Sequence, residues 1–138
     1  MEQVADRRPG GSETILLVED DASVRNPIKR ILSRQGYTVL EARHGADALQ
    51  VLGDATRTVD LVMTDLMMPG MGGLELIPEL LVLSRPPRIV LMSGHAGPAV
   101  MEGVSLPPST RFLEKPFTLE NLLQTVRAAL DAPSGSAA

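Results

Sequence analysis

Four of the short apolar runs in this sequence are followed by side chains that could act together in one reaction. They are Glu19, Asp20 and Asp21 after the first run, Asp65 after the third, Ser93 and Gly94 after the fourth, and Glu114, Lys115 and Pro116 after the fifth. Carboxylates brought together repel by about 4 kcal/mol per pair at 4 Å and an effective dielectric near 20, so the group needs a cation. Oxygen donors without histidine or cysteine favour magnesium over zinc. The pattern therefore predicts a Mg²⁺ site, unless each acid is only a solvated loop residue.

Asp65 is the candidate nucleophile of this group. A carboxylate can attack phosphorus and form an aspartyl phosphate when a metal and a cation share the charge of the phosphoryl oxygens. Asp65 follows the apolar run at 61–64 and precedes a Met-Pro-Gly turn at 68–70 that would keep the loop stiff. The alternative interpretation is an aspartate that merely forms the turn ahead of the proline.

Ser93 and Lys115 are the candidate partners of a phosphoryl group on Asp65. The hydroxyl can donate a hydrogen bond, and the ammonium supplies a point charge. Lys115 precedes Pro116, and because an X-Pro bond adopts the cis form at little cost, a bend there could aim the lysine inward. Taken singly, a Ser-Gly pair is most often a turn and a lysine is most often surface charge, so the assignment depends on all the positions together.

The candidate residues follow elements that alternate along the chain. The apolar runs, rich in Val, Ile and Leu, are 14–18, 38–40, 61–64, 88–92 and 111–113. They are nearly continuous rather than alternating, which is typical of parallel strands covered on both faces. Helical segments between them predict right-handed crossovers and an open sheet between two helical layers. Ligands of such sheets bind beyond the carboxyl ends of the strands, where the candidate residues stand.

Two of the predicted helices have complete apolar stripes. The first carries Val24, Ile28 and Leu32 at helical spacing and should end near Gly36 in a left-handed cap. The last begins behind Thr118, a residue type that caps helix N-termini.

The other helical segments are less regular. Ala46, Leu49 and Leu52 form a weak stripe in the second. Pro78 interrupts the stripe of the third, so we expect either a kink or a helix that starts close to the proline. A fourth helix within 97–103 would span barely two turns.

Together these elements predict an α/β fold of the (βα)5 type, a doubly wound five-stranded parallel sheet in a three-layer sandwich. A chain of 138 residues has room for one domain, which we expect at 13–131. Residues 1–12 include Arg-Arg-Pro-Gly-Gly, and residues 132–138 are mostly Ala, Ser and Gly. Both segments are expected to be flexible tails because they can bury little apolar surface.

Composition excludes several classes of protein. With 43% apolar and 22% charged residues, the chain has the make-up of a folded domain. Its 13 Lys and Arg against 17 Asp and Glu lack the basic surplus that nucleic-acid binding needs. The absence of cysteine excludes disulfides and thiolate chemistry. No signal-peptide pattern or apolar run of about 20 residues occurs, so we expect a cytoplasmic protein without a membrane or nucleic-acid partner.

Four motifs between Thr14 and Leu130 carry a resemblance to a known family. They are Ile-Leu-Leu-Val-Glu-Asp-Asp at 15–21, Asp-Leu-Met-Met-Pro-Gly at 65–70, Met-Ser-Gly at 92–94 and Phe-Leu-Glu-Lys-Pro-Phe at 112–117. In this order they resemble the CheY-like receiver domains of two-component response regulators. A chemotaxis member of that family has the flavodoxin-like strand order 2-1-3-4-5, which the resemblance implies here. The Leu-Pro-Pro stretch before the last motif is more similar to receivers fused to hybrid sensor histidine kinases than to those that drive a DNA-binding output.

The resemblance implies a role for each acidic residue. Asp65 would accept the phosphoryl group. Glu19 and Asp20 would form the acidic pair, with Asp20 as the direct Mg²⁺ ligand and Asp21 as a neighbour. Met67 would offer only its main-chain carbonyl to the metal, so that its side chain is irrelevant there.

The resemblance also implies a conformational switch. Ser93 would move toward the phosphoryl group and Lys115 would pair with it. The family's switch aromatic corresponds to Phe112, which has no hydroxyl and could equally be a core residue. Hydrogen bonds to charged groups contribute roughly 1.5 to 3 kcal/mol each. Since inverting a 1:99 equilibrium takes about 5.5 kcal/mol, three such contacts could suffice.

The implied function is that of a phosphoaccepting receiver in a phosphorelay. A histidine kinase or histidine phosphotransfer domain would donate the phosphoryl group, and the receiver itself would assist both its arrival and its hydrolysis with Mg²⁺. The phosphorylated form would regulate a partner, and a phosphorylation-dependent homodimer is compatible with this role. The chain would then be a signalling protein without an output domain and not an enzyme, although its parent protein could be a histidine kinase.

Three alternatives remain at this point. A phosphohydrolase that uses an aspartyl phosphate would want a second carboxylate where Met67 stands. A nucleotide-binding module would need a glycine-rich turn where Glu19, Asp20 and Asp21 stand. A degenerate receiver would use the fold only for protein contacts, and the complete acidic set argues against it.

Overall fold

A computed structural model of the chain describes residues 9–54, 56–68, 70–94 and 105–133. Five parallel strands form one sheet in the order β2-β1-β3-β4-β5. Their bounds are β1 Thr14–Val18, β2 Thr38–Ala42, β3 Leu61–Asp65, β4 Arg88–Ser93 and β5 Arg111–Glu114. The predicted fold class and strand order are confirmed. The segment of the predicted fourth helix, 97–103, lies outside the described residues.

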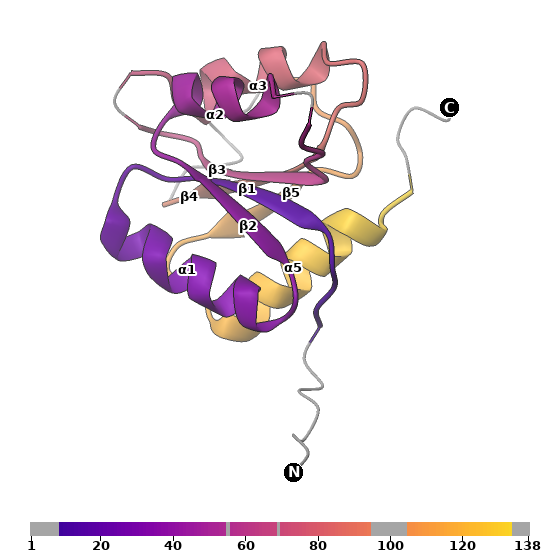
Figure 1. Ribbon diagram of the computed structural model, residues 1–138. Helices are drawn as coiled ribbons and strands as arrows, with labels where there is room; N and C mark the ends of the chain where they lie inside the picture. The colour runs from indigo at the N-terminus through magenta and orange to yellow at the C-terminus, as the bar shows by residue number, and fades with distance from the viewer. Residues whose placement is uncertain (1–8, 55, 69, 95–104, 134–138) are drawn as a thin grey trace.

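Helices cover both faces of the sheet. The described residues form α1 Ala22–Arg34, α2 Gly45–Leu52, α3 Gly73–Leu81 and α5 Leu119–Asp131. Figure 1 shows α1 and α5 on one face and α2 and α3 on the other. Side chains of β1 alternate between the two layers, since Ile15 and Leu17 belong to the α1–α5 core and Leu16 and Val18 to the α2–α3 core. The predicted three-layer sandwich therefore has one apolar core on each side of the sheet.

Burial differs between the central and the edge strands. Every residue of β3 is buried, as are all but the first residues of β1 and β4. The edge strands β2 and β5 are only partly covered, so the expectation of strands covered on both faces holds for the three central ones. The strands β3 and β4 each extend one residue beyond the apolar run that predicted them. Asp65 and Ser93 are therefore the last residues of their strands.

The helix ends follow the local sequence. Asp21 caps α1 by accepting a hydrogen bond from the main-chain N–H of Ser23 at 2.9 Å, and Thr118 caps α5 as predicted. Gly36 follows the C-cap of α1 with φ of 100°, a conformation that other residues rarely adopt. The helix α3 begins well before Pro78, so a start close to the proline is wrong. The proline is exposed, and the hydrogen bond it removes lies on the solvent side.

The weak stripe predicted for α2 is correct for Leu49 and Leu52, which pack against the α2–α3 core, and wrong for Ala46. Ala46 is exposed, whereas Gly45 and Ala48 are the buried residues of the helix. Gly45 packs so closely on Met71 that an added Cβ would overlap the methionine side chain, and its N–H donates to the Met71 carbonyl at 2.8 Å. Small residues form the buried side because α2 approaches the loop before α3 closely, and apolarity alone does not reveal this.

Residues 9–12, expected to belong to a loose tail, lie against α1 and α5. The N–H of Gly11 donates to the Gln35 carbonyl at 3.1 Å, and Nη1 of Arg127 donates to the Gly10 carbonyl at 3.0 Å. Arg127 also forms a two-pronged ion pair with Glu13, at 3.1 and 2.7 Å. The glycines permit this approach, since a Cβ on Gly10 would come within 2.5 Å of the Gln35 carbonyl oxygen.

Replacing Arg127 with methionine is expected to lower the free energy of unfolding by about 1 to 2 kcal/mol. Charge-assisted hydrogen bonds contribute roughly 1.5 to 3 kcal/mol. The expected contribution is smaller here because the side chains of Arg127 and Glu13 are both about a quarter exposed to water. Urea denaturation measures the change. Arg30→Met is the matched control, because Arg30 is exposed on α1 and has no ion pair within the described part of the chain. Equal losses in both variants would contradict a specific role for Arg127.

Stability at acid pH should report on the same ion pair. The hydrogen bonds from Arg127 hold the pKa of Glu13 below its usual 4.5 in the folded chain. A lowered pKa contributes stability that is present above the unfolded value and is lost as pH falls through the folded value. Arg127→Met should therefore lose less stability than the parent protein between neutral pH and the region below pH 4.5. If the free energy of unfolding changed with pH by the same amount in both proteins, the Arg127–Glu13 ion pair would contribute nothing to the pH dependence of stability.

Candidate phosphoacceptor site

Asp65, Glu19 and Lys115 meet at the carboxyl edge of the sheet. Val18 pairs with Thr64 across β1 and β3, so Glu19 and Asp65 are the next residues on neighbouring strands. Nζ of Lys115 lies 2.5 Å from Oδ2 of Asp65 and 3.2 Å from Oε1 of Glu19. Three residues from separate strand ends thus form one charged cluster, as the predicted convergence requires.

Two donors hold the Asp65 carboxylate in place. Lys115 binds Oδ2, and the main-chain N–H of Met67 donates to Oδ1 at 3.0 Å. The residue is only 8% exposed, so the carboxylate is oriented but still reaches solvent. This geometry suits a nucleophile approached from outside the fold.

Glu19 is the most deeply buried charge of the cluster, at 1% exposure. Burial raises the pKa of Glu19, while the Asp21 N–H and the Lys115 ammonium partly offset that rise. A buried carboxylate beside a second one favours a cation nearby. The sequence interpretation of these acids as solvated loop residues does not hold for Glu19 or Asp65.

Lys115 reaches the cluster from the loop after β5. Its main-chain N–H donates to the Ser93 carbonyl at 2.7 Å, and the Lys115–Pro116 peptide bond is cis. Burial alone would lower the pKa of Lys115, but hydrogen bonds and charge interactions with Asp65 and Glu19 outweigh it and raise the pKa. The ammonium is therefore fully charged at neutral pH.

Ser93 and Phe112 differ in their surroundings. Ser93 is 8% exposed and lies one residue beyond Met92, the register partner of Asp65 on β4. Phe112, on edge strand β5, is 38% exposed, so it is not a core residue. It lines a surface hollow of about 440 Å³ together with Lys115. The Phe112 ring is therefore available at the surface.

The residues present fit a hydrated Mg²⁺ ion. Glu19, Asp20 and Asp65 offer only oxygen donors, Asp20 is exposed and makes no ion pair in the described part of the chain, and the Met67 carbonyl accepts no hydrogen bond there. Within the same residues no three acidic or imidazole side chains form a ready-made metal cage. Magnesium does not need one, since it typically takes one or two carboxylates and keeps several waters.

Asp21 serves the site differently from its neighbours. Its carboxylate accepts from both the N–H and the hydroxyl of Ser23 and so is committed to the start of α1. Its own N–H donates to Glu19 at 3.2 Å. The Asp-Ala-Ser spacing was a helix-cap signal that the sequence interpretation did not use, and it separates Asp21 from the acids that remain available.

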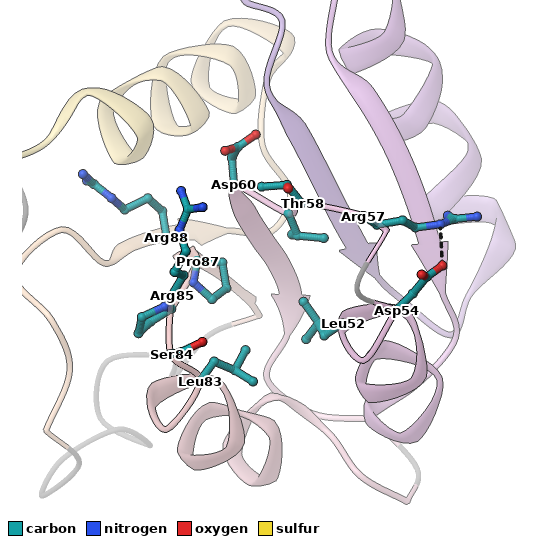
Figure 2. A pocket seen from close by; sticks show the side chains of 12 residues that line it. Leu52, Asp54, Arg57, Thr58, Asp60, Leu83, Ser84, Arg85, Pro87 and Arg88 are labelled. Carbon is teal, nitrogen blue, oxygen red and sulfur yellow. Dashed lines mark ion pairs between the residues drawn. The ribbon is translucent and has the colours of Figure 1, made fainter.

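A cavity of about 450 Å³ lies at the amino ends of the strands, between the loops that precede β3 and β4 (Figure 2). Arg57 pairs there with Asp54 at 3.2 Å, and Asp60 accepts a hydrogen bond from the Thr14 N–H at 2.8 Å. None of the lining residues belongs to the Asp65 cluster. This cavity and the candidate phosphoacceptor site are therefore separate features.

Comparison with known proteins agrees with this geometry. The family model of the response regulator receiver domain matches residues 15–127. The chain belongs to this family. Receivers are the phosphoacceptor domains of two-component systems, so the cluster around Asp65 lies in a receiver fold. Within the described residues of this receiver, no helix is long and apolar enough to cross a membrane.

Relatives of this receiver include both kinase-linked and separate domains. Sensor kinase CckA of Brucella abortus is 38% identical over 121 residues, which cover 88% of this chain and 13% of the kinase. The crystal structure of the receiver domain of hybrid histidine kinase CckA matches with a TM-score of 0.69 and 29% identity, covering 86% of this chain and 99% of that one. The chemotaxis response regulator CheY4 of Vibrio cholerae matches with a TM-score of 0.76 and 26% identity, covering 87% and 100%.

Several curated relatives are much longer than the part that matches. The match covers 48% of a transcriptional regulatory protein of Bacillus subtilis and 48% of CpxR of Klebsiella pneumoniae, besides the small share of CckA. The resemblance therefore concerns the receiver portion of those proteins.

Proposed function

We propose that this receiver accepts a phosphoryl group on Asp65 from a phosphohistidine of a histidine kinase or histidine phosphotransfer domain. The observation that carries the proposal is the ammonium of Lys115 at 2.5 Å from Asp65, beside the buried Glu19. The cytoplasm is the proposed setting, as the composition predicts. Phosphorylation would then shift the receiver to a form that regulates a partner or pairs with a second copy.

The transfer follows from the groups around Asp65. One carboxylate oxygen attacks phosphorus, an O–P bond forms, the N–P bond of the donor histidine breaks, and the imidazole keeps the electron pair. Lys115 stays charged throughout and neutralises the phosphoryl oxygens. The Met67 N–H keeps the carboxylate oriented while the donor approaches. Hydrolysis reverses the state when water attacks the same phosphorus and releases phosphate.

Magnesium would be held by Asp20, Glu19, Asp65 and the Met67 carbonyl. When bound, the ion supplies charge neutralisation for the phosphoryl oxygens. The acidic residues would contribute the oxygen donors, and Lys115, which contacts both Glu19 and Asp65, balances part of their charge.

The switch would start at Ser93 and Phe112. Ser93 ends β4 beside the site, and its hydroxyl is a donor that a phosphoryl group on Asp65 could attract. Movement there would change the loop that follows Gly94. Phe112 is exposed on the neighbouring strand, so its ring can respond by packing and not by a hydrogen bond.

Incubation with acetyl phosphate, with and without Mg²⁺, tests the proposal. Intact-mass measurement should show one added phosphoryl group that depends on Mg²⁺, and peptide mapping should assign it to Asp65. Amide spectra with beryllofluoride should show shifts at Ser93 and Gly94. An unmodified mass under conditions that phosphorylate a reference receiver would reject the function.

A further inference from the structure

Three methionines share the loop after β3, and they differ in how they are packed. Met68 and Met71 are half-buried and contact the α2–α3 core. Met67 belongs to neither apolar core and is 67% exposed. Met63 and Met92, on the strands beside it, are completely buried. The described chain therefore presents one freely accessible thioether, next to the phosphoacceptor.

Met67 is also coupled to Asp65 through the main chain. Its N–H donates to Oδ1 of Asp65 at 3.0 Å, so its Cα lies within one peptide unit of the acceptor carboxylate. The exposed Met67 side chain therefore stands on a residue whose main chain contacts the acceptor carboxylate. A change in the polarity of the Met67 side chain would therefore act on the approach of an anion.

We propose that Met67 is an oxidation site at which peroxide lowers phosphoryl uptake by this receiver. The sulfur attacks one oxygen of hydrogen peroxide, an S–O bond forms, the O–O bond breaks, and the second oxygen leaves as water after proton transfer. Sulfur is oxidised by two electrons and the peroxide is reduced by two. The product sulfoxide is polar and can be returned to the thioether by a sulfoxide reductase.

The effect on phosphoryl uptake rests on the proposed function. An apolar thioether adds no charge to the surface beside Asp65, whereas a sulfoxide oxygen adds a partial negative charge that disfavours an anionic phosphoryl donor. We expect uptake to slow by about threefold. This is the effect expected when a partial charge repels an anion a few ångströms away in water. The buried Met63 and Met92 cannot respond in the same way because peroxide does not reach them.

The experiment treats the full 138-residue chain with hydrogen peroxide. Peptide mass spectrometry follows the sulfoxide at each methionine with time, and acetyl phosphate uptake is measured before and after treatment. Met67→Leu keeps an apolar side chain that peroxide does not oxidise, and each variant is compared with its own untreated sample. Met68→Leu is the matched control from the same loop.

The expected result is oxidation of Met67 at least about tenfold faster than of Met63 or Met92, as thioether exposure dictates. Uptake should fall after treatment in the parent protein and in Met68→Leu but not in Met67→Leu. Equal oxidation rates at Met67 and the buried methionines would overturn the proposal. So would an equal fall in uptake in Met67→Leu.

The two proposals fail separately. If the untreated chain takes up no phosphoryl group, the proposed function is wrong, and the inhibitory effect falls with it. The oxidation kinetics are read by mass alone and still decide whether Met67 is the modified residue. If uptake is normal and Met67 oxidation leaves it unchanged, only the inhibitory effect is rejected.

Discussion

Replacing Asp65 with asparagine should reduce phosphoryl uptake from acetyl phosphate by more than about 10³-fold, because the amide cannot serve as the nucleophile. The change is nearly isosteric, so Oδ1 can still accept from the Met67 N–H. Intact-mass kinetics in Mg²⁺ buffer measure the loss.

Asp21→Asn is the control for that substitution. Asp21 is also an acid beside the site, but its carboxylate caps α1, and asparagine caps helices about as well as aspartate. This variant should take up the phosphoryl group at close to the parent rate. Uptake at the parent rate by Asp65→Asn would show that another residue is the acceptor.

Replacing Lys115 with methionine should slow uptake by about 10²-fold, the loss seen when one charged or hydrogen-bonding group that stabilises a transition state is removed. Methionine keeps the length of the side chain but not its charge. The carboxylates of Asp65 and Glu19 then face an incoming anion without the ammonium that contacts both. Single-turnover kinetics with acetyl phosphate at saturating Mg²⁺ measure the effect.

Lys29→Met is the control for Lys115→Met, because it removes one lysine charge at a position away from Asp65. Lys29 is exposed on α1 and pairs with Glu41 at 2.7 Å, away from Asp65. It should leave the uptake rate within about twofold of the parent, since a distant exposed charge is largely screened. Equal slowing by both substitutions would mean that net charge, and not the position of Lys115, controls the reaction.

Much of the fold was readable because its signals are local. The apolar runs predicted all five strands, and Thr118 predicted the start of α5, because burial on both faces and helix capping depend on neighbouring residues. The stripe predicted for α2 wrongly included Ala46 and missed Gly45 and Ala48, which are buried for their small size. Close packing between α2 and the Met71 loop decides that, and it is not a property of the helix sequence.

Contacts between distant residues were not readable in the same way. Arg127 and Glu13 are 114 positions apart, and nothing in the glycine-rich segment before β1 indicates that a helix at the other end of the chain holds it. A polar segment of that composition has no apolar period to mark it as packed. Only the folded position of α5 beside the segment that precedes β1 brings the two charges together.

The candidate site combines both kinds of information. The sequence alone determined which residues follow the strands, and with the family motifs it singled out Asp65, Glu19 and Lys115. The tertiary structure alone decided that Lys115 touches both acids, that Glu19 is buried and that Phe112 lies at the surface. The physical reason is that residue types and strand ends are encoded locally, whereas distances and burial depend on how segments 50 or more positions apart pack around the sheet.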